Sequence, residues 1–382
     1  MHAKNGAPAT SKSDAQVADD MYPFLRRYKD GRVERLVVGT FVPPSSSPDA
    51  TGVATRDVVI DPRTGVSVRL FLSVGTAAMG SRLPLAVYFH GGAFCTGSAF
   101  SGIFQRYAAT LSAHAEALVV SVDYRLAPEH PIPAAYDDAW MAFRWVVSLS
   151  DPWLACHADP MRVFLVGESA GANIVHNVAL RSASRHGQDL NNIQGIVLLQ
   201  PFFWGTERLP SETNRVDGPV FSPEFVDTVW PFLTAGAAGN DDPRLNPPAE
   251  QVMSLRCRRA LVTVAAKDVL RDRGCRYATW LRCSEWCREV TLVESESEDH
   301  GFHLYRPARA SAVALMDCVA EFINDGILAS PIAETELHQE RPNVQLRARD
   351  GIQREQGQAR FTKPAQKGPI SCAAGTMAKS CL

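Results

Sequence analysis

The stretch VFLVGESAG, residues 163–171, decides the fold of this chain, because it joins an apolar run to a Gly-x-Ser-x-Gly pattern. A helical pattern begins near Ala172, so the order predicts a strand, a sharp turn and a helix, with Ser169 at the turn. Small flanking residues let strand and helix pass closely, and a helix N-terminus stabilises negative charge beside the serine. The pattern favours a nucleophilic serine over a plain structural turn.

β-rich runs alternate with helix-length segments outward from this turn. From Val58 onward the runs are VVI, VSVRLFLSV, LAVYFH, ALVVSVDY, RVFLVG, GIVLLQP, RALVTVA and EVTLVE. The later runs are continuously apolar, which is typical of strands buried on both faces of a parallel sheet. Mixed apolar and polar spacing predicts amphipathic helices over residues 101–114, 134–149, 170–184, 271–287 and 306–324. We expect an α/β fold with a mostly parallel eight-stranded sheet flanked by helices.

The apolar pattern covers only part of the 382 residues. Residues 1–20 are polar and aperiodic, and residues 327–382 contain a single aromatic side chain. We therefore expect a disordered arm and a disordered polar tail on either side of one domain, residues 21–326. Residues 203–250 interrupt the alternation and are rich in Pro and Gly. Together with residues 21–50, they are expected to form a small helical cap.

Composition disfavours several classes of function. The formal net charge of -2 gives no broad electrostatic basis for binding nucleic acid or an anionic membrane. No apolar run is long enough to predict a membrane span, and the first residues lack the apolar core of a secretory signal. Nine dispersed cysteines then predict free thiols in a reducing compartment, so we expect a cytoplasmic protein. Cys283 and Cys287 lie four residues apart, but two further ligands at metal-site spacing are missing, which favours thiols over a metal site.

A second glycine-rich stretch, YFHGGAF at residues 88–94, ends another apolar run. Attack of a serine on a carbonyl group creates a tetrahedral oxyanion, which needs backbone N–H donors about 3 Å away. A glycine pair lets the backbone come that close. We expect donors from this loop and from Ala170, the residue after the serine. The alternative is a plain glycine turn after a strand.

A nucleophilic serine needs a base, and the base needs an orienting carboxylate. His300 follows the last expected strand, where loops gather above the sheet, and a glycine comes directly after it. His303 is its competitor. Asp268 ends the preceding strand and is the expected carboxylate, with Asp272 one helical turn later as the runner-up. The other downstream histidines lie in the helix after the turn, a polar loop and the tail: His176, His186 and His338.

Quoted together, these motifs resemble the plant carboxylesterases of the hormone-sensitive-lipase-like, or gibberellin-receptor-like, group of α/β hydrolases. The segments are YFHGGAFCTGSAFS, VDYRLAPEHPIPAAYDDAW, GESAGANIVHN, KDVLRDRG and EDHGFH, with PFLRRYKDGRVERL and DVVIDPRTGVSVRLFL nearer the N-terminus. The resemblance runs from about Met21 to Ile327. It implies a serine hydrolase of a small-molecule ester, with an N-terminal cap and with no metal or organic cofactor.

The resemblance also implies roles for particular residues. The triad falls on Ser169, Asp268 and His300, the oxyanion hole on Gly91 and Gly92 with Ala170, and His90 supports the loop. Two positions depart from the family pattern: Ala93 replaces the usual third glycine, and Glu168 replaces the commoner aspartate. A methyl group at position 93 is expected to narrow the pocket against bulky acyl groups.

The leading hypothesis is a serine carboxylesterase acting on short-to-medium acyl or aromatic esters through an acyl-enzyme. An alternative is a lyase, because the 2-hydroxyisoflavanone dehydratases share these motifs, or an acyl transfer that forms a lactone. A hormone-binding receptor is disfavoured, because the gibberellin receptors replace the histidine that stands here as His300.

Overall fold

The computed structural model describes residues 16–184, 193–213 and 221–324. The chain divides at residue 330, and the unit beyond it, which holds most of the expected tail, lies outside the described residues. Residues 1–15 of the expected arm lie outside them too.

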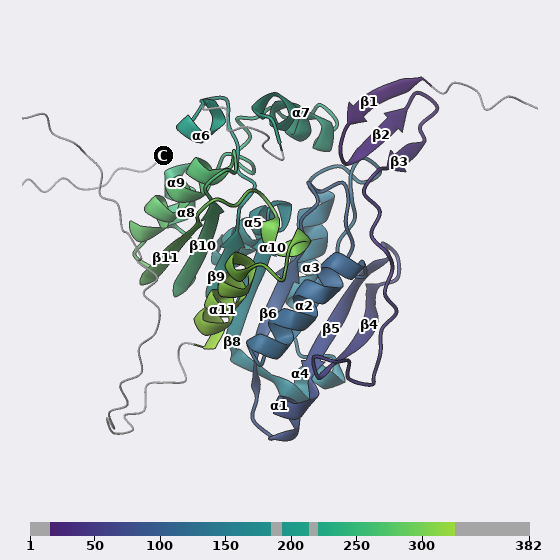
Figure 1. Cartoon of the computed structure of the whole chain (residues 1–382), viewed down its shortest axis with the longest axis vertical. Helices are drawn as coiled ribbons and strands as arrows, with labels where there is room; N and C mark the ends of the chain where they lie inside the picture. Colours follow the sequence, from purple (N-terminus) through teal and green to yellow (C-terminus); the bar gives the residue numbers. More distant parts are fainter. Residues whose placement is uncertain (1–15, 185–192, 214–220, 325–382) are drawn as a thin grey trace, which may run out of the picture. The chain divides into compact units, whose positions relative to one another are not determined.

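An eight-stranded sheet carries the fold, as the sequence predicts (Figure 1). Its spatial order is β11-β10-β9-β8-β6-β7-β5-β4. The six strands from β11 to β7 run parallel, whereas β5 is antiparallel to both β7 and β4. The strands are β4 Val53–Asp61, β5 Val66–Ser73, β6 Leu83–Phe89, β7 Leu118–Asp123, β8 Ala158–Glu168, β9 Ile193–Leu199, β10 Arg259–Ala265 and β11 Glu289–Ser295.

Helices cover both faces of the sheet (Figure 1). One face carries α2 (Gly102–His114) and α11 (Ala310–Asn324), and the other carries α3 (Ala134–Val147), α5 (Ala170–Ser184) and α9 (Arg271–Arg282). The expected helix 271–287 ends early, at Arg282. Shorter helices lie in the connections: α1 Val74–Ala78, α4 Pro152–His157, α8 Ala249–Met253 and α10 Phe302–Tyr305. None of the helices among the described residues is long and apolar enough to cross a membrane.

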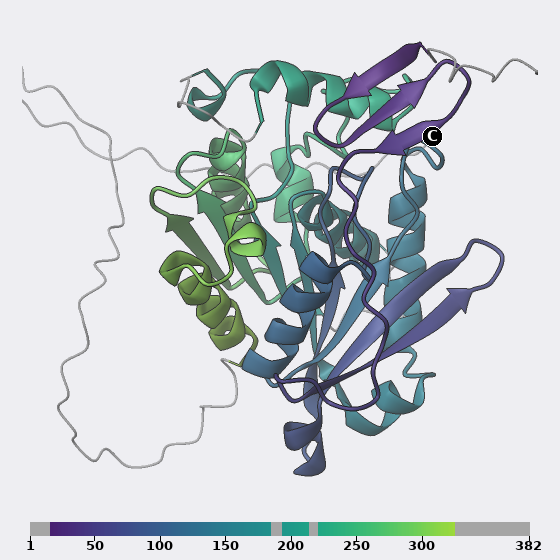
Figure 2. The same cartoon turned by 45° about the vertical axis from the view of Figure 1, so that its right-hand side comes forward.

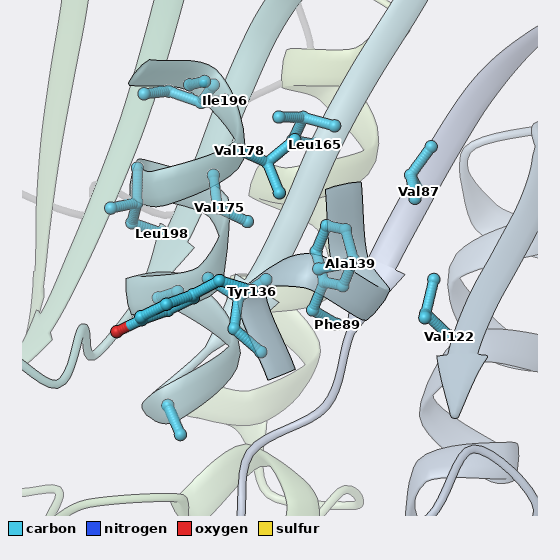
Figure 3. Close-up of a cluster of buried hydrophobic side chains, with 14 of the residues drawn as sticks. Val87, Phe89, Val122, Tyr136, Ala139, Leu165, Val175, Val178, Ile196 and Leu198 are labelled. Carbon is cyan, nitrogen blue, oxygen red and sulfur yellow. The ribbon is translucent and has the colours of Figure 1, made fainter. Parts of the chain in front are cut away.

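The core between the sheet and the α3–α5 layer fixes the start of α5. Phe89 and Leu165 from the strands face Val175 of α5 and Tyr136 of α3 in Figure 3, and all four are buried. Burying each such side chain stabilises the fold by about 1.5–3 kcal/mol. The Tyr136 hydroxyl also donates to the Asn173 side chain at 2.6 Å, which satisfies the polar end of a buried ring.

A three-stranded antiparallel sheet forms the N-terminal part of the cap: β1 Val17–Met21, β2 Leu25–Tyr28 and β3 Val33–Arg35. Two expectations are therefore wrong: residues 17–20 belong to a strand and not to an arm, and this part of the cap is not helical. The polar composition is misleading because the charges pair across the hairpin, Arg27 with Asp19 at 2.6 Å and Arg26 with Asp20 at 3.2 Å.

The helical part of the cap comes from the interruption at residues 203–250. It contains α6 (Pro210–Thr213) and α7 (Pro223–Leu233), and Figure 2 shows α7 beside the three-stranded sheet. Phe24, after β1, lies 5.5 Å from Phe221 and 5.9 Å from Phe225, measured between ring centroids. Aromatic packing thus joins the two cap segments.

Candidate active site

Four loops of the candidate site follow the carboxyl ends of parallel strands. β6 leads into the loop of residues 90–97, β8 into Ser169, β10 into Asp268 and β11 into His300. Because parallel strands end at the same edge of a sheet, residues far apart in sequence come together there.

The turn at Ser169 has the strained geometry that its sequence predicts. Ser169 has a φ of 54°, in the left-handed region. A Cβ on Gly167 would lie 2.4 Å from the Gly171 carbonyl, and a Cβ on Gly171 would lie 1.9 Å from the carbonyl oxygen of Phe89. Both glycines are required because strand, turn and helix pass too closely for a side chain.

A hydrogen-bonded line connects Ser169, His300 and Asp268. His300 Nδ1 lies 2.7 Å from Asp268 Oδ2, and His300 Nε2 lies 2.9 Å from Ser169 Oγ. A carboxylate only accepts, so Nδ1 carries the proton of the neutral ring and Nε2 is free to accept from the serine hydroxyl. The other oxygen of Asp268 accepts from the N–H of Leu270 at 2.9 Å, which fixes the carboxylate.

The environment of His300 strengthens it as a base. Burial disfavours the imidazolium and lowers the pKa of His300, but attraction to Asp268 and the hydrogen bond between them raise it more. The net pKa of His300 is above its ordinary value of 6.5. Gln200, directly after β9, holds the same loop, because its Oε1 accepts a hydrogen bond from the N–H of Gly301 at 2.6 Å. The sequence analysis did not single out Gln200. The signal that could have found it is a polar side chain directly after a buried apolar strand.

The competing residues have other surroundings. His303 is buried, neither ring nitrogen has a hydrogen-bond partner among the described residues, and burial lowers its pKa to about 3. Asp272 accepts from the N–H of Ser211 at 2.9 Å. His176 Nδ1 lies 2.9 Å from the Tyr277 hydroxyl within the core. His186 and His338 lie outside the described residues.

The loop after β6 differs from the expected oxyanion hole at its first glycine. The N–H of Gly91 donates to the side chain of Glu168, so it is not available to a reacting oxygen. The expectation for Gly91 needs correction. In contrast, the N–H groups of Gly92 and Ala93 have no acceptor among the described residues. Ala170 is the first residue of α5, so its N–H has no acceptor within the helix either.

The same loop makes a tight left-handed turn. Gly92 has a φ of 103°, and a Cβ there would lie 2.3 Å from the carbonyl oxygen of Thr96. Ala93 and Phe94 follow with φ values of 50° and 57°, which L-residues rarely adopt. Ala93 therefore adopts a backbone conformation that favours glycine, the residue usual at this position in the family pattern.

His90, the first residue of this loop, is buried. Its ring stacks on Tyr124 at 4.4 Å between centroids, and its Nδ1 donates to the Gly91 carbonyl at 2.7 Å. The Tyr124 hydroxyl donates to the His90 carbonyl at 2.7 Å. Burial lowers the pKa of His90, so its ring is neutral and held by the loop it touches.

An aromatic side chain that sequence reasoning did not single out lies against the candidate base. Phe221 meets the His300 ring edge-on, with centroids 5.3 Å apart. Two other aromatic residues of the same interruption belong to the core instead: Trp204 is fully buried, and Phe203 stacks on Tyr277 with ring centroids 4.7 Å apart.

The cysteines in the described part of the chain are free thiols. Cys287 lies beyond the end of α9 and hydrogen bonds with Cys257, so it does not share a helix face with Cys283. Within residues 16–184, 193–213 and 221–324, no group of three or more His, Cys, Asp or Glu side chains is arranged to hold a metal ion.

A mostly parallel sheet with a serine turn, a histidine and a carboxylate at its carboxyl edge defines the α/β-hydrolase class. The sequence pattern of the alpha/beta hydrolase fold family matches residues 86–304, and the chain belongs to that family. It is an enzyme of the esterase type, and its likeness to the plant carboxylesterases of the hormone-sensitive-lipase-like group is confirmed.

Three plant relatives align over more than four-fifths of this chain. A 2-hydroxyisoflavanone dehydratase of Glycyrrhiza echinata is 41% identical over 83% of this chain and 99% of its own length. Probable carboxylesterase 2 of Arabidopsis thaliana is 39% identical over 81% and 97%. The chloroplastic tuliposide A-converting enzyme 1 of Tulipa gesneriana is 41% identical over 83% and 80%.

Solved structures give the same class. A hyperthermophilic esterase from the archaeon Pyrobaculum calidifontis superposes with a TM-score of 0.61 at 28% identity. The superposition covers 70% of this chain and 82% of that protein.

Proposed function

We propose that the protein is a serine carboxylesterase that hydrolyses short-to-medium acyl or aromatic esters of small molecules. The observation that carries this proposal is the line from Ser169 through His300 to Asp268, with both hydrogen bonds within 2.9 Å. The line ends at a serine on a strained turn, where its hydroxyl can meet a substrate.

In the proposed mechanism, Ser169 Oγ attacks the ester carbonyl while His300 Nε2 accepts its proton. The imidazolium then protonates the leaving alcohol, and Asp268 stabilises that charge and holds the ring orientation. A water molecule attacks the acyl-enzyme by the same route, and the serine is released with the carboxylic acid. No cofactor takes part in these steps.

The proposed oxyanion hole consists of the N–H groups of Gly92, Ala93 and Ala170. Gly91 is left out because Glu168 already accepts its N–H, so we assign Gly91 and Glu168 to the support of the loop. His90 also supports the loop, since its Nδ1 donates to the loop backbone. Removing one such donor typically costs a factor of about 10²–10³ in kcat.

The proposed substrate class rests on the walls near His300. Phe221, Phe24 and Phe225 are half-buried and mutually packed, which suits an apolar or aromatic group beside the base. The methyl group of Ala93 stands where a third glycine would leave more room, which suits acyl groups without branching.

Ser169→Ala tests the proposal. Turnover of p-nitrophenyl butyrate should fall by about 10³-fold or more, because the nucleophile acts as a unit with its base. A fluorophosphonate probe should label the wild-type protein at Ser169 and leave the variant unlabelled. Ser148→Ala, at an exposed serine that hydrogen bonds to the Trp145 carbonyl, is the control and should keep full activity. Full activity in Ser169→Ala would exclude the assignment.

A lyase is the second candidate, favoured by the 41% identity to a 2-hydroxyisoflavanone dehydratase. The same serine, histidine and N–H donors suit proton abstraction and oxyanion stabilisation without an acyl-enzyme. Product analysis with 2-hydroxyisoflavanones and with aryl esters separates these activities, and also detects a lactone. The cytoplasmic location stays a prediction, which imaging of a fluorescent fusion tests.

A further inference from the structure

Arg35, the last residue of the cap strand β3, makes four hydrogen bonds outside the cap. Its Nε donates to the carbonyl of Cys95 at 2.9 Å, and its Nη2 donates to the carbonyl of Ala127 at 3.2 Å. Glu129 accepts from both Nη atoms, at 2.8 Å and 2.7 Å. The side chain is therefore a fork that reaches from the N-terminal sheet into the hydrolase domain.

The first carbonyl belongs to the loop that carries the proposed oxyanion donors. Within this loop the N–H groups of Cys95 and Thr96 both donate to the Gly92 carbonyl, at 3.0 Å and 2.9 Å. Ala127 also binds the loop, because its N–H donates to the Phe94 carbonyl at 2.9 Å. Arg35 thus holds the far side of the turn twice, directly through Cys95 and indirectly through Ala127.

This turn needs external restraint. Ala93 and Phe94 are consecutive left-handed residues, a backbone conformation that is unfavourable for side chains other than glycine. Strained residues of this kind persist only where surrounding contacts over-determine them. Glu168 restrains the loop at Gly91, on the side of the sheet. Arg35 and Ala127 add restraints at Cys95 and at Phe94.

We propose that Arg35 is a positioning residue that fixes the oxyanion loop, so that the cap sheet takes part in catalysis as well as covering the site. This inference rests on the proposed esterase function. Arg35 itself touches no reacting atom. Lysine cannot replace it fully, because an ammonium group lacks the planar fork that serves two carbonyls and a carboxylate together.

The test compares Arg35→Met and Arg35→Lys with Arg26→Met as the matched control. Arg26 lies on β2 of the same sheet, and among the described residues its side chain hydrogen bonds only to the exposed Asp20. Hydrolysis of p-nitrophenyl butyrate gives kcat and KM, and an alkyl trifluoromethyl ketone, which forms an oxyanion adduct with the serine, gives the affinity for a charged tetrahedral state.

We expect Arg35→Met to lower kcat about 10-fold or more, with KM changed less than threefold. The affinity for the trifluoromethyl ketone should fall by the same factor as kcat. Arg35→Lys should recover part of the loss, and Arg26→Met should stay within twofold of the wild type. Glu129→Gln should cost less than Arg35→Met, because the two carbonyl contacts remain. It also keeps the proposal testable if Arg35→Met does not fold.

A merely structural tether would give a different result. If Arg35→Met changes KM alone, or leaves the affinity of the ketone unchanged, the residue shapes the pocket and the proposal is overturned. If the wild type shows no ester hydrolysis, the proposed function fails separately. Amide hydrogen exchange of residues 91–97 then measures the restraint on the loop directly. Faster exchange in Arg35→Met than in Arg26→Met supports the positioning role of Arg35, and equal exchange refutes it.

Discussion

Glu168 accepts a hydrogen bond from the N–H of Gly91, which ties the residue before the candidate nucleophile to the candidate oxyanion loop. Burial raises the pKa of Glu168 to about 8, so the carboxyl group is mostly protonated at pH 7. Glu168→Gln should therefore keep kcat within about threefold. Glu168→Leu should destabilise the fold by about 1–3 kcal/mol, because the Gly91 N–H stays buried without an acceptor. Denaturant unfolding and ester kinetics measure both.

The same carboxyl group predicts a pH dependence of stability. Its pKa is raised from 4.5 in the unfolded chain to about 8 in the fold, so its contribution is complete below pH 4.5 and is lost as pH rises through 8. The free energy of unfolding of Glu168→Gln, relative to the wild type, should accordingly rise across this window. A constant difference between pH 5 and pH 9 would contradict the burial argument.

The pKa of His300 predicts the acid limb of the activity profile. His300 accepts a proton only when neutral, and its pKa lies above 6.5 because Asp268 stabilises the imidazolium. The kcat/KM should thus fall as pH drops through a value above 6.5. Asp268→Asn should move this limb to lower pH and reduce kcat by about 10⁴-fold, since the ring loses its tautomer. If the acid limb stays at the same pH in Asp268→Asn, a group other than His300 controls it.

Local patterns predicted most of the fold, and they singled out the three residues that form the hydrogen-bonded line of the candidate site. The eight strands and the Ser169, Asp268 and His300 positions follow from apolar runs and from the residues that end them, which are properties of short segments. The hydrogen bond from the Gly91 N–H to Glu168 was not predictable, because its acceptor is a carboxyl group on the neighbouring strand. Strand β1 was missed because its stabilising ion pairs are made across a hairpin.

The cap was the least predictable part for the same physical reason. Phe221 and Phe24 lie far apart in the sequence, in segments with neither strand nor helix periodicity, and only tertiary packing brings Phe24 against Phe221 and Phe221 against His300. Gln200 likewise acquires its role from Gly301, which lies 101 residues further along the chain.

Gly171→Ala tests the steric requirement of the serine turn. The added Cβ would lie 1.9 Å from the Phe89 carbonyl oxygen, and a backbone atom must move to admit it. We expect a loss of about 2–3 kcal/mol or more in stability, together with most of the activity. Gly75→Ala is the matched control: it lies in helix α1 with nothing within 4 Å of its Cβ, so stability should stay equal or rise. Equal unfolding midpoints would refute the close approach.

Ala93→Gly tests whether the methyl group of Ala93, which stands in place of the usual third glycine, narrows the pocket for the acyl group. Glycine relieves the left-handed strain at φ 50° but increases the entropy of the unfolded chain, so stability should change by less than about 1 kcal/mol. Loss of the methyl group should raise kcat/KM for p-nitrophenyl pivalate relative to acetate, by about 10-fold. An unchanged pivalate-to-acetate ratio would place the methyl group outside the acyl pocket.

Phe221→Ala tests the aromatic wall beside the base. The Phe221 ring meets His300 edge-on at 5.3 Å and stacks on Phe225 at 6.0 Å, so its removal takes away an apolar wall beside the base, where we expect the leaving alcohol. Such a contact contributes about 1–3 kcal/mol to a transition state that uses it. We expect kcat/KM for phenyl acetate to fall about 10-fold, and that for methyl acetate less than threefold. Phe232→Ala is the control: Phe232 lies in α7, the helix that follows Phe221, with Arg27 over its ring, and its loss should leave the ratio unchanged. If both acetates decline equally in Phe221→Ala, the ring supports His300 rather than selecting the alcohol.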